Sequence, residues 1–474
     1  MDYPDRSLSR RDPAVGHTGE MSCQRSSTVE HLPADPVGEA VGSAIAEILE
    51  GSSVELLYSP DDLPLPPAPD GPAAASASGS GPPGWHVTLT VRIGGPIAPF
   101  VTPASTPLLE ILNALPGAGL RAASAFAMVR GAGAAPLSPS LRRALRDTIV
   151  IEALSRHHAC RADRPVTTEL IADTVEYLIE LSGTRVESHD LTHGVVITDV
   201  LEDTPRLRFE YPADLRAAKR APLLFDGQRA LLVVDKEGRA RTELQGHRLD
   251  RLTRGAARLD QDATAFSHSG SLVAEATSRL GGIGFFLRAD RSIWVFADGQ
   301  PLLIRRGEHW SAFPLELATA ISSAIGASVA TVNILVQTAF LISAQRHGAI
   351  LAIVDDPDSL EGIVPEKDRY DLRDAVEPMK MQTETRLHHL IDAEGLDAQT
   401  LARFAALDGA TILDRNAHLL AYGAIVTSSD SQHEGARTAA ATTLSHTADI
   451  VLKVSVDGDI TVFRDGEVVA TLLG

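Results

Sequence analysis

The chain has 474 residues, of which 44% are hydrophobic and 22% are charged, with a formal net charge of −19. This length suffices for about two to four domains with sizeable cores, and the composition is that of a globular protein. The negative charge argues against a nucleic-acid-binding face, because phosphate contacts need clustered lysine and arginine. Cys23 and Cys160 are the two cysteines and lack metal-ligand spacing. We therefore expect a cytoplasmic protein without a disulfide framework.

The amino-terminal third is predicted to be α+β. Residues 1–33 lack hydrophobic periodicity and are predicted to be disordered. Residues 34–182 are expected to form the first folded region, with a Pro-, Ala-, Gly- and Ser-rich loop at 59–84. Periodicity predicts strands at 54–58 and 85–93, and helices at 36–50, 107–115, 138–157 and 167–182.

Residues 183–312 are predicted to be rich in β-strands. Short apolar runs alternate with turn sequences such as Asp226-Gly227, whose residues tolerate the backbone angles of tight turns. The predicted strands cover residues 194–198, 206–210, 222–225, 228–235, 283–287, 292–296 and 301–305.

A stretch without charged residues, Leu317 to Gln345, opens the last region and is long enough to span a membrane. Polar residues, including Ser322, Asn333 and Gln337, interrupt it. We therefore favour one or two buried or amphipathic helices over a membrane segment, and we predict no membrane association.

Residues 313–474 are predicted to be α/β, with small-residue turns beside apolar strands. The strands cover 347–354, 406–413 and 448–455, and turns at strand ends are where open α/β sheets bind ligands. The turn Asp408-Gly409-Ala410 offers a carboxylate that can hold a divalent metal, and its small residues let the backbone approach a phosphate.

A second motif, Gly435-Ala436-Arg437-Thr438, opens a helix of small residues. A helix amino terminus that carries Arg and Thr favours anions, through its free amides and the guanidinium. Ser455 ends the last of these strands and offers a hydroxyl. Taken singly, the three features are more simply a hairpin turn, a helix cap and a strand end, so their order along the chain carries the functional interpretation.

In that order, the features resemble the diadenylate cyclase domain. Its members have a Gly-Ala-x-x-x-Ile strand, an Asp-Gly-Ala turn, a Gly-Thr-Arg-His-Arg-Ala-Ala segment and a strand that ends in Ser-Glu. Here Asp408-Gly409-Ala410 matches the turn, Gly435 and Arg437 with Ala440 and Ala441 match the third motif, and Ser455 matches the strand end. The resemblance covers about a third of the chain, residues 313–474.

The resemblance implies a mixed β-sheet flanked by helices and an enzyme that condenses two ATP molecules into cyclic di-AMP and pyrophosphate. It implies that Asp408 is the catalytic and metal-binding carboxylate, with Mg²⁺ or Mn²⁺ as cofactor, and that Arg437 is catalytic. The nucleotide would contact Gly409, Ala410, Gly435, Thr438 and Ser455. Because two domains must face each other, a homodimer or larger assembly is implied, with residues 34–312 as a sensor-like region.

Four positions depart from the family pattern. Leu407 replaces a histidine, Thr438-Ala439 replaces His-Arg, and Val456 replaces an acidic residue. Each change removes a charged or proton-bearing group that could contact phosphate or metal. The first alternative is therefore a nucleotide-binding signalling regulator with the same fold and little or no turnover. A scaffold whose β-rich middle region binds a partner is the second.

Overall fold

A computed structural model of the chain shows a mixed α/β protein with several sheets. The structure describes residues 35–49, 52–60, 74–80, 85–93, 107–130, 136–159, 165–186, 189–198, 209–218, 221–246, 249, 272–297, 299–312, 317–374, 386–393, 395–427 and 435–473. The predicted disordered segment 1–33 and both cysteines lie outside these ranges.

The first region combines a three-stranded antiparallel sheet with helices. The strands β1 (Ser53–Pro60), β3 (Trp85–Arg92) and β2 (Ala74–Ser80) are ordered β1-β3-β2. The helices are α1 (Pro36–Ile48), α2 (Pro107–Arg130), α3 (Pro139–Ala159) and α4 (Thr168–Ser182). Buried apolar residues such as Ile45, Leu89 and Leu115 share one core, which confirms the predicted amphipathic pattern.

Two predictions for this region were wrong in part. The expected loop at 59–84 contains β2, because an edge strand pairs through its backbone and does not need bulky side chains. The helix expected to end at Leu115 continues through Pro116 to Arg130. Burial of Leu112 and Leu115 before the proline and of Ala118 and Ala122 after it offsets the hydrogen bond that proline cannot donate.

The middle region forms a seven-stranded sheet, as its β-rich sequence predicts. The strand order is β12-β11-β10-β9-β6-β7-β8, in which β6 and β7 are parallel. These strands are β6 (His193–Ile197), β7 (Ala230–Val234), β8 (Ala240–Gln245), β9 (Ile283–Leu287), β10 (Ile293–Ala297), β11 (Gln300–Arg306) and β12 (His309–Ala312). A helix over 272–280, α5 (Ala213–Ala217) and the two-stranded β4 (Arg185–Val186) and β5 (His189–Asp190) complete it.

Three differences from prediction occur here. The expected strand at 222–225 is instead the 3₁₀ helix η2 (Ala221–Leu224), whose Leu223 and Leu224 are exposed rather than buried in a sheet. Of the strand expected at 206–210, residues 206–208 lie outside the described part, and Glu210 makes an isolated bridge to Arg239. The edge strands β8 and β12 were not predicted, because their polar sequences give no buried-strand signal.

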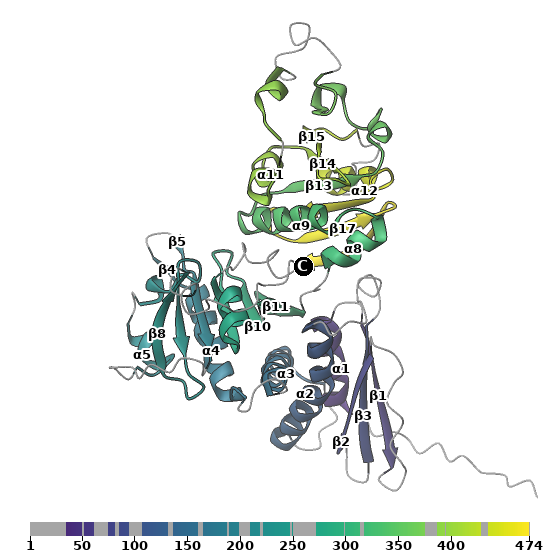
Figure 1. The fold of residues 1–474 in the computed structure, drawn as a ribbon. Coiled ribbons are helices and arrows are strands. Elements are labelled where there is room, and N and C mark those ends of the chain that lie inside the picture. The colour runs from purple at the N-terminus through teal and green to yellow at the C-terminus, as the bar shows by residue number, and fades with distance from the viewer. Residues whose placement is uncertain are drawn as a thin grey trace, which may run out of the picture. The chain divides into compact units, whose positions relative to one another are not determined.

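The last region is a six-stranded mixed sheet with helices on both faces (Figure 1). Its order is β15-β14-β13-β16-β17-β18, with one parallel pair, β13 and β14. The strands are β13 (Ala349–Val354), β14 (Ala410–Asp414), β15 (Leu419–Ala424), β16 (Ile450–Val454), β17 (Ile460–Arg464) and β18 (Glu467–Leu473). The helices are α8 (Leu317–Ile325), α9 (Val329–Ala344), α11 (Ala398–Ala405) and α12 (Ala436–Ser445), with short 3₁₀ turns η3 (Pro357–Leu360), η4 (Glu366–Asp368) and η6 (His388–Leu390).

Alternation along β13 explains why both faces of this sheet are covered. Leu351 and Ile353 belong to the core shared with α9 and α11, whereas Ile350 and Ala352 pack in a second cluster with α12. The continuous apolar run of β13 therefore follows from its burial on both sides.

The uncharged stretch Leu317 to Gln345 forms α8 and α9, separated at Gly326. Within the described residues, no helix is long and apolar enough to cross a membrane. The expectation of one or two buried or amphipathic helices is confirmed, and there are two.

Candidate nucleotide site at one end of the C-terminal sheet

The predicted motifs meet at one end of the six-stranded sheet. The start of β14 lies beside the start of β13, since Ala410 pairs with Ile350. The end of β16 lies on the other side of β13, since Val454 pairs with Ala349. The amino terminus of α12 reaches the same end, where Arg437 lies against Gly348. Segments that are far apart in the sequence thus meet at one end of the sheet. We call this end, where β13 and β14 begin and β16 finishes, the candidate edge.

Asp408 and Arg437 are in contact at this edge. A terminal nitrogen of Arg437 lies 3.7 Å from a carboxylate oxygen of Asp408, and the two side chains are 44% and 89% exposed. A carboxylate and a guanidinium are therefore both open to solvent at one place. A long, exposed ion pair contributes little to stability, so both groups remain available for a ligand.

Gly348, which precedes β13, sets the position of Arg437. A Cβ atom at Gly348 would lie 2.7 Å from the guanidinium carbon of Arg437, closer than such atoms approach. The guanidinium therefore lies directly over the Gly348 backbone, and a side chain there would displace it. Glycine at this position therefore allows the observed place of the guanidinium, whereas the backbone angle does not require glycine.

The other residues of the first two motifs differ in accessibility. Gly435 is exposed at the N-cap of α12, and a Cβ added there would meet open space. Thr438 lies in the first turn of α12, where its hydroxyl accepts a hydrogen bond from Lys453 at 3.2 Å. Ala410 is fully buried in the cluster under α12. Only its backbone can therefore approach a nucleotide.

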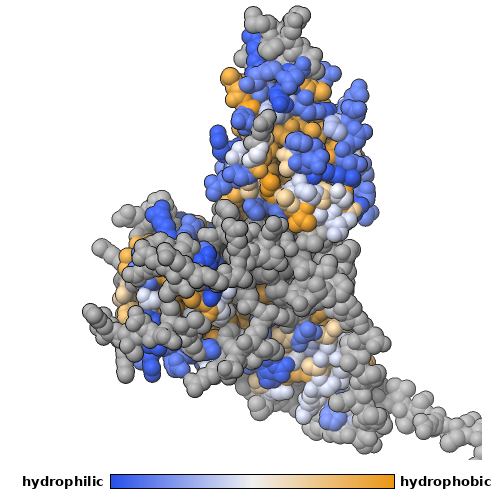
Figure 2. Space-filling view, in the orientation of Figure 1, coloured by the Kyte–Doolittle hydropathy of each residue, from blue (hydrophilic) through white to orange (hydrophobic). Residues whose placement is uncertain are grey.

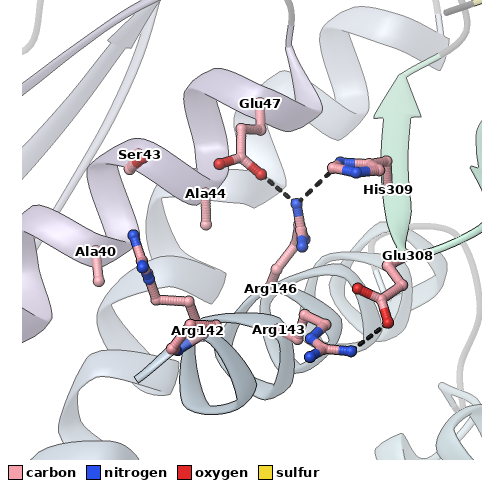
Figure 3. A pocket seen from close by; sticks show the side chains of 10 residues that line it. Ala40, Ser43, Ala44, Glu47, Arg142, Arg143, Arg146, Glu308 and His309 are labelled. Atoms are coloured by element: carbon pink, nitrogen blue, oxygen red, sulfur yellow. Dashed lines mark hydrogen bonds and ion pairs between the residues drawn. The ribbon is translucent and has the colours of Figure 1, made fainter. Parts of the chain in front are cut away.

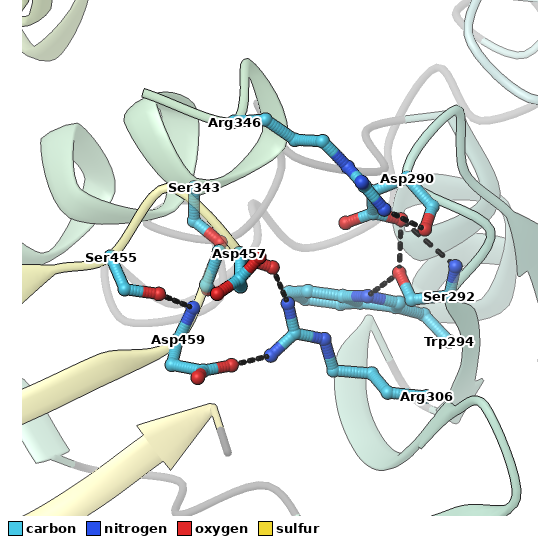
Figure 4. A network of polar contacts seen from close by, with 10 residues as sticks. Asp290, Ser292, Trp294, Arg306, Ser343, Arg346, Ser455, Asp457 and Asp459 are labelled. Carbon is cyan, nitrogen blue, oxygen red and sulfur yellow. Dashed lines mark hydrogen bonds and ion pairs between the residues drawn. The ribbon is translucent and has the colours of Figure 1, made fainter. Parts of the chain in front are cut away.

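Ser455 forms part of the turn between β16 and β17 (Figure 4). Its hydroxyl oxygen accepts a hydrogen bond from the Asp459 amide at 3.0 Å, and its own amide donates to the Asp459 carbonyl at 2.8 Å. Arg306 also binds this turn, donating to the Asp459 carboxylate at 2.8 Å and to the Asp457 carbonyl at 2.9 Å. The turn therefore fixes the position of the Ser455 hydroxyl oxygen, and the hydroxyl hydrogen remains able to donate to a ligand.

Exposed apolar side chains border the same edge. Leu407 precedes Asp408, Ile425 follows the end of β15 beside β14, and Val456 follows Ser455; their exposures are 48%, 57% and 55%. Figure 2 shows hydrophobic residues between hydrophilic ones on the visible face of this α/β region. Exposed apolar side chains that gather in one patch with a polar rim are typical of interaction surfaces.

The described residues around Asp408 can hold a divalent metal only with help from a ligand. No group of three or more His, Cys, Asp or Glu side chains with metal-binding geometry occurs among them. Mg²⁺ commonly binds one or two carboxylates together with substrate phosphates. One exposed carboxylate beside an arginine therefore fits a metal that arrives with a nucleotide.

A separate pocket lies between α1, α3 and the start of β12 (Figure 3). It encloses about 240 Å³, and its lining includes Arg142, Arg143 and Arg146. Arg143 pairs with Glu308, and Arg146 pairs with Glu47. Because two of the three guanidinium groups already have carboxylate partners, this pocket is better explained as a surface ion-pair network than as an anion site.

Two residues of the edge were not singled out from the sequence. Gly348 is the glycine of the Gly-Ala-x-x-x-Ile pattern, and only the contact with Arg437 shows its purpose. Lys453 is the one charged residue within the apolar strand β16, a signal that could have marked it. Gly348 precedes β13 and Lys453 lies within β16. The sequence does not specify how these strands pair, so it does not show which residues each side chain meets.

No family model and no curated protein matches this sequence.

Proposed function

We propose that this protein is a diadenylate cyclase, which condenses two ATP molecules into cyclic di-AMP and releases pyrophosphate. The observation that carries the proposal is the contact between Asp408 and Arg437, exposed together at one edge of the sheet. A carboxylate and a guanidinium side by side can bind a metal–triphosphate complex, because one group holds the cation and the other the phosphates.

The chemistry requires each 3′-hydroxyl to attack the α-phosphorus of the facing ATP. An oxygen–phosphorus bond forms, the bond to pyrophosphate breaks, and the hydroxyl proton leaves. Catalysis consists mainly of in-line positioning and charge neutralisation, and bound Mg²⁺ or Mn²⁺ supplies part of the latter. Asp408 would orient the metal or accept the proton, and Arg437 and Thr438 would hold the phosphates. Gly409, Gly435 and the Ala410 backbone would line the nucleotide, and Ser455 would donate a hydrogen bond to it.

The proposal includes a homodimer or larger assembly, because one domain presents one nucleotide and the reaction needs two that face each other. The exposed apolar side chains Leu407, Ile425 and Val456 support this, since they border the edge that a second copy would cover. Residues 34–312 would then be the sensor-like region.

The test is to incubate the purified protein with ATP and Mg²⁺ or Mn²⁺ and to separate the products by mass. We expect cyclic di-AMP from the wild type and a loss of at least roughly a hundredfold in Asp408→Asn. Asp465→Asn is the matched control, because Asp465 is equally exposed at 85% and lies at the other end of β17. Arg437→Ala should weaken ATP binding roughly tenfold to a hundredfold.

The second candidate function is a nucleotide-binding regulator without turnover. The presence of Leu407, Thr438-Ala439 and Val456 where the family has charged or proton-bearing groups favours it. ATP binding that depends on Arg437, without any product, would support this function and reject the cyclase. Neither binding nor product would reject both.

A further inference from the structure

The partly buried side chain of Lys453 lies at the candidate edge, where its ammonium group has no carboxylate partner among the described residues. It extends from β16, where the residues on either side are buried and apolar. Its amine donates to the Thr438 hydroxyl at 3.2 Å and lies 5.8 Å from the centre of the Phe463 ring. Among the residues with described positions, no carboxylate oxygen lies within ion-pair distance of Lys453.

The Lys453 ammonium is partly buried and has one neutral protein acceptor, so the described residues leave its charge unneutralised. An ammonium has three donors, and the Thr438 hydroxyl uses one of them. The Phe463 ring adds a weak cation–π attraction that fixes the amine without neutralising it. Because removing a charge from water is costly unless a counter-charge is present, this arrangement favours an anion at the amine.

The amine and the guanidinium approach the edge from different elements. Thr438, which binds Lys453, directly follows Arg437 in the first turn of α12. Arg437 already has Asp408 as a partial counter-charge, whereas Lys453 has none among the described residues. Two cations that flank one helix terminus, one fixed on a strand and one on the helix, can contact different oxygens of a polyphosphate.

We propose that Lys453 is a further phosphate-binding residue of this site and that it contacts the triphosphate of the bound nucleotide. This inference rests on the proposed nucleotide site. Lys453 supplies from β16 a positive charge next to Thr438, the first of the two positions where the His-Arg of the related motif is missing. β16 thus supplies a positive charge that α12 does not supply at these positions.

The experiment is a titration of the full-length protein with ATP and, separately, with adenosine, which has no phosphates. In Lys453→Met we expect ATP affinity to fall roughly tenfold to a hundredfold, because a charge-assisted hydrogen bond is lost, and adenosine affinity to stay within about twofold. Lys453→Arg keeps the charge and should retain most of the ATP affinity. Arg464→Met is the control, since it removes one positive charge at the far end of neighbouring β17.

A second measurement on the wild type avoids any variant that fails to fold. Lysine acetylation followed by mass spectrometry should show that ATP protects Lys453, with the partly exposed Lys236, in the turn after β7 of the seven-stranded sheet, as the reference. If Arg437→Ala loses ATP binding while Lys453→Met keeps it, or if ATP leaves Lys453 unprotected, the role of Lys453 is refuted and the site stands. A wild type that binds no ATP refutes the site and this inference together.

Discussion

The contact between Gly409 and Gly423 gives a prediction whose size can be worked out from the structure. Gly409 has a φ of 114°, a backbone angle that strongly favours glycine. A Cβ there would lie 2.4 Å from the carbonyl carbon of Gly423 and 2.7 Å from the Ala424 amide nitrogen. Backbone atoms at the β14–β15 pairing cannot move aside as the end of a side chain can.

Gly409→Ala should therefore destabilise this sheet edge through two effects. Holding alanine at this φ costs roughly 1–3 kcal/mol, and relieving the overlap with Gly423 costs about as much again. The matched control is Gly362→Ala in the same region, because Gly362 has a φ of 76° but nothing within 4 Å of an added Cβ. That variant should lose only about 1 kcal/mol, from the left-handed backbone alone.

The assay is native-state hydrogen exchange of the β14 and β15 amides, because a chain of several regions need not unfold in one step. We expect faster exchange in Gly409→Ala, corresponding to a loss of roughly 2–6 kcal/mol of local opening free energy. If Gly409→Ala and Gly362→Ala cost the same, the close approach of the two glycine backbones is not a constraint, and the reasoning fails.

Two further predictions concern a ligand contact and a buried titrating group. Gly348→Ala should shift the flexible Arg437 side chain and lower ATP affinity roughly tenfold, while the free energy of unfolding falls by less than about 0.5 kcal/mol. An unchanged ATP affinity would show that Arg437 acts elsewhere. Burial lowers the pKa of His193 to about 4, so the unfolded chain takes up a proton between pH 6.5 and 4 that the folded chain does not. Stability should fall by roughly 2 kcal/mol from pH 7 to pH 5 on this account, and urea titrations of His193→Leu should show a correspondingly smaller pH slope than the wild type.

The sequence by itself determined most local elements of the C-terminal region. The apolar run at 347–354 predicted a buried strand, observed as β13 over Ala349–Val354, and the small-residue segment after Gly435 predicted α12. These predictions held because burial periodicity and helix capping act over a few neighbouring residues. Elements without such a signal were missed, as the polar edge strand β8 shows.

The candidate site was predictable only as a set of motifs. Asp408 and Arg437 were both chosen from the sequence, and their contact is a finding of the structure. Nothing local indicated that Lys453 would donate to Thr438 or that Gly348 would lie beneath Arg437. These partners come from different helices and strands, so their proximity depends on strand order and register.

Strand order also decided which end of the sheet forms the edge. The usual expectation for open α/β sheets is a ligand at the carboxyl ends of parallel strands. Here the motifs gather at the amino ends of β13 and β14, because β16 runs antiparallel to β13 and brings Ser455 and Lys453 to that end. The sequence thus determined which groups could bind a nucleotide, and the tertiary structure decided which of them meet, because pairing between distant strands is set by the packing of the whole sheet and not by neighbouring residues.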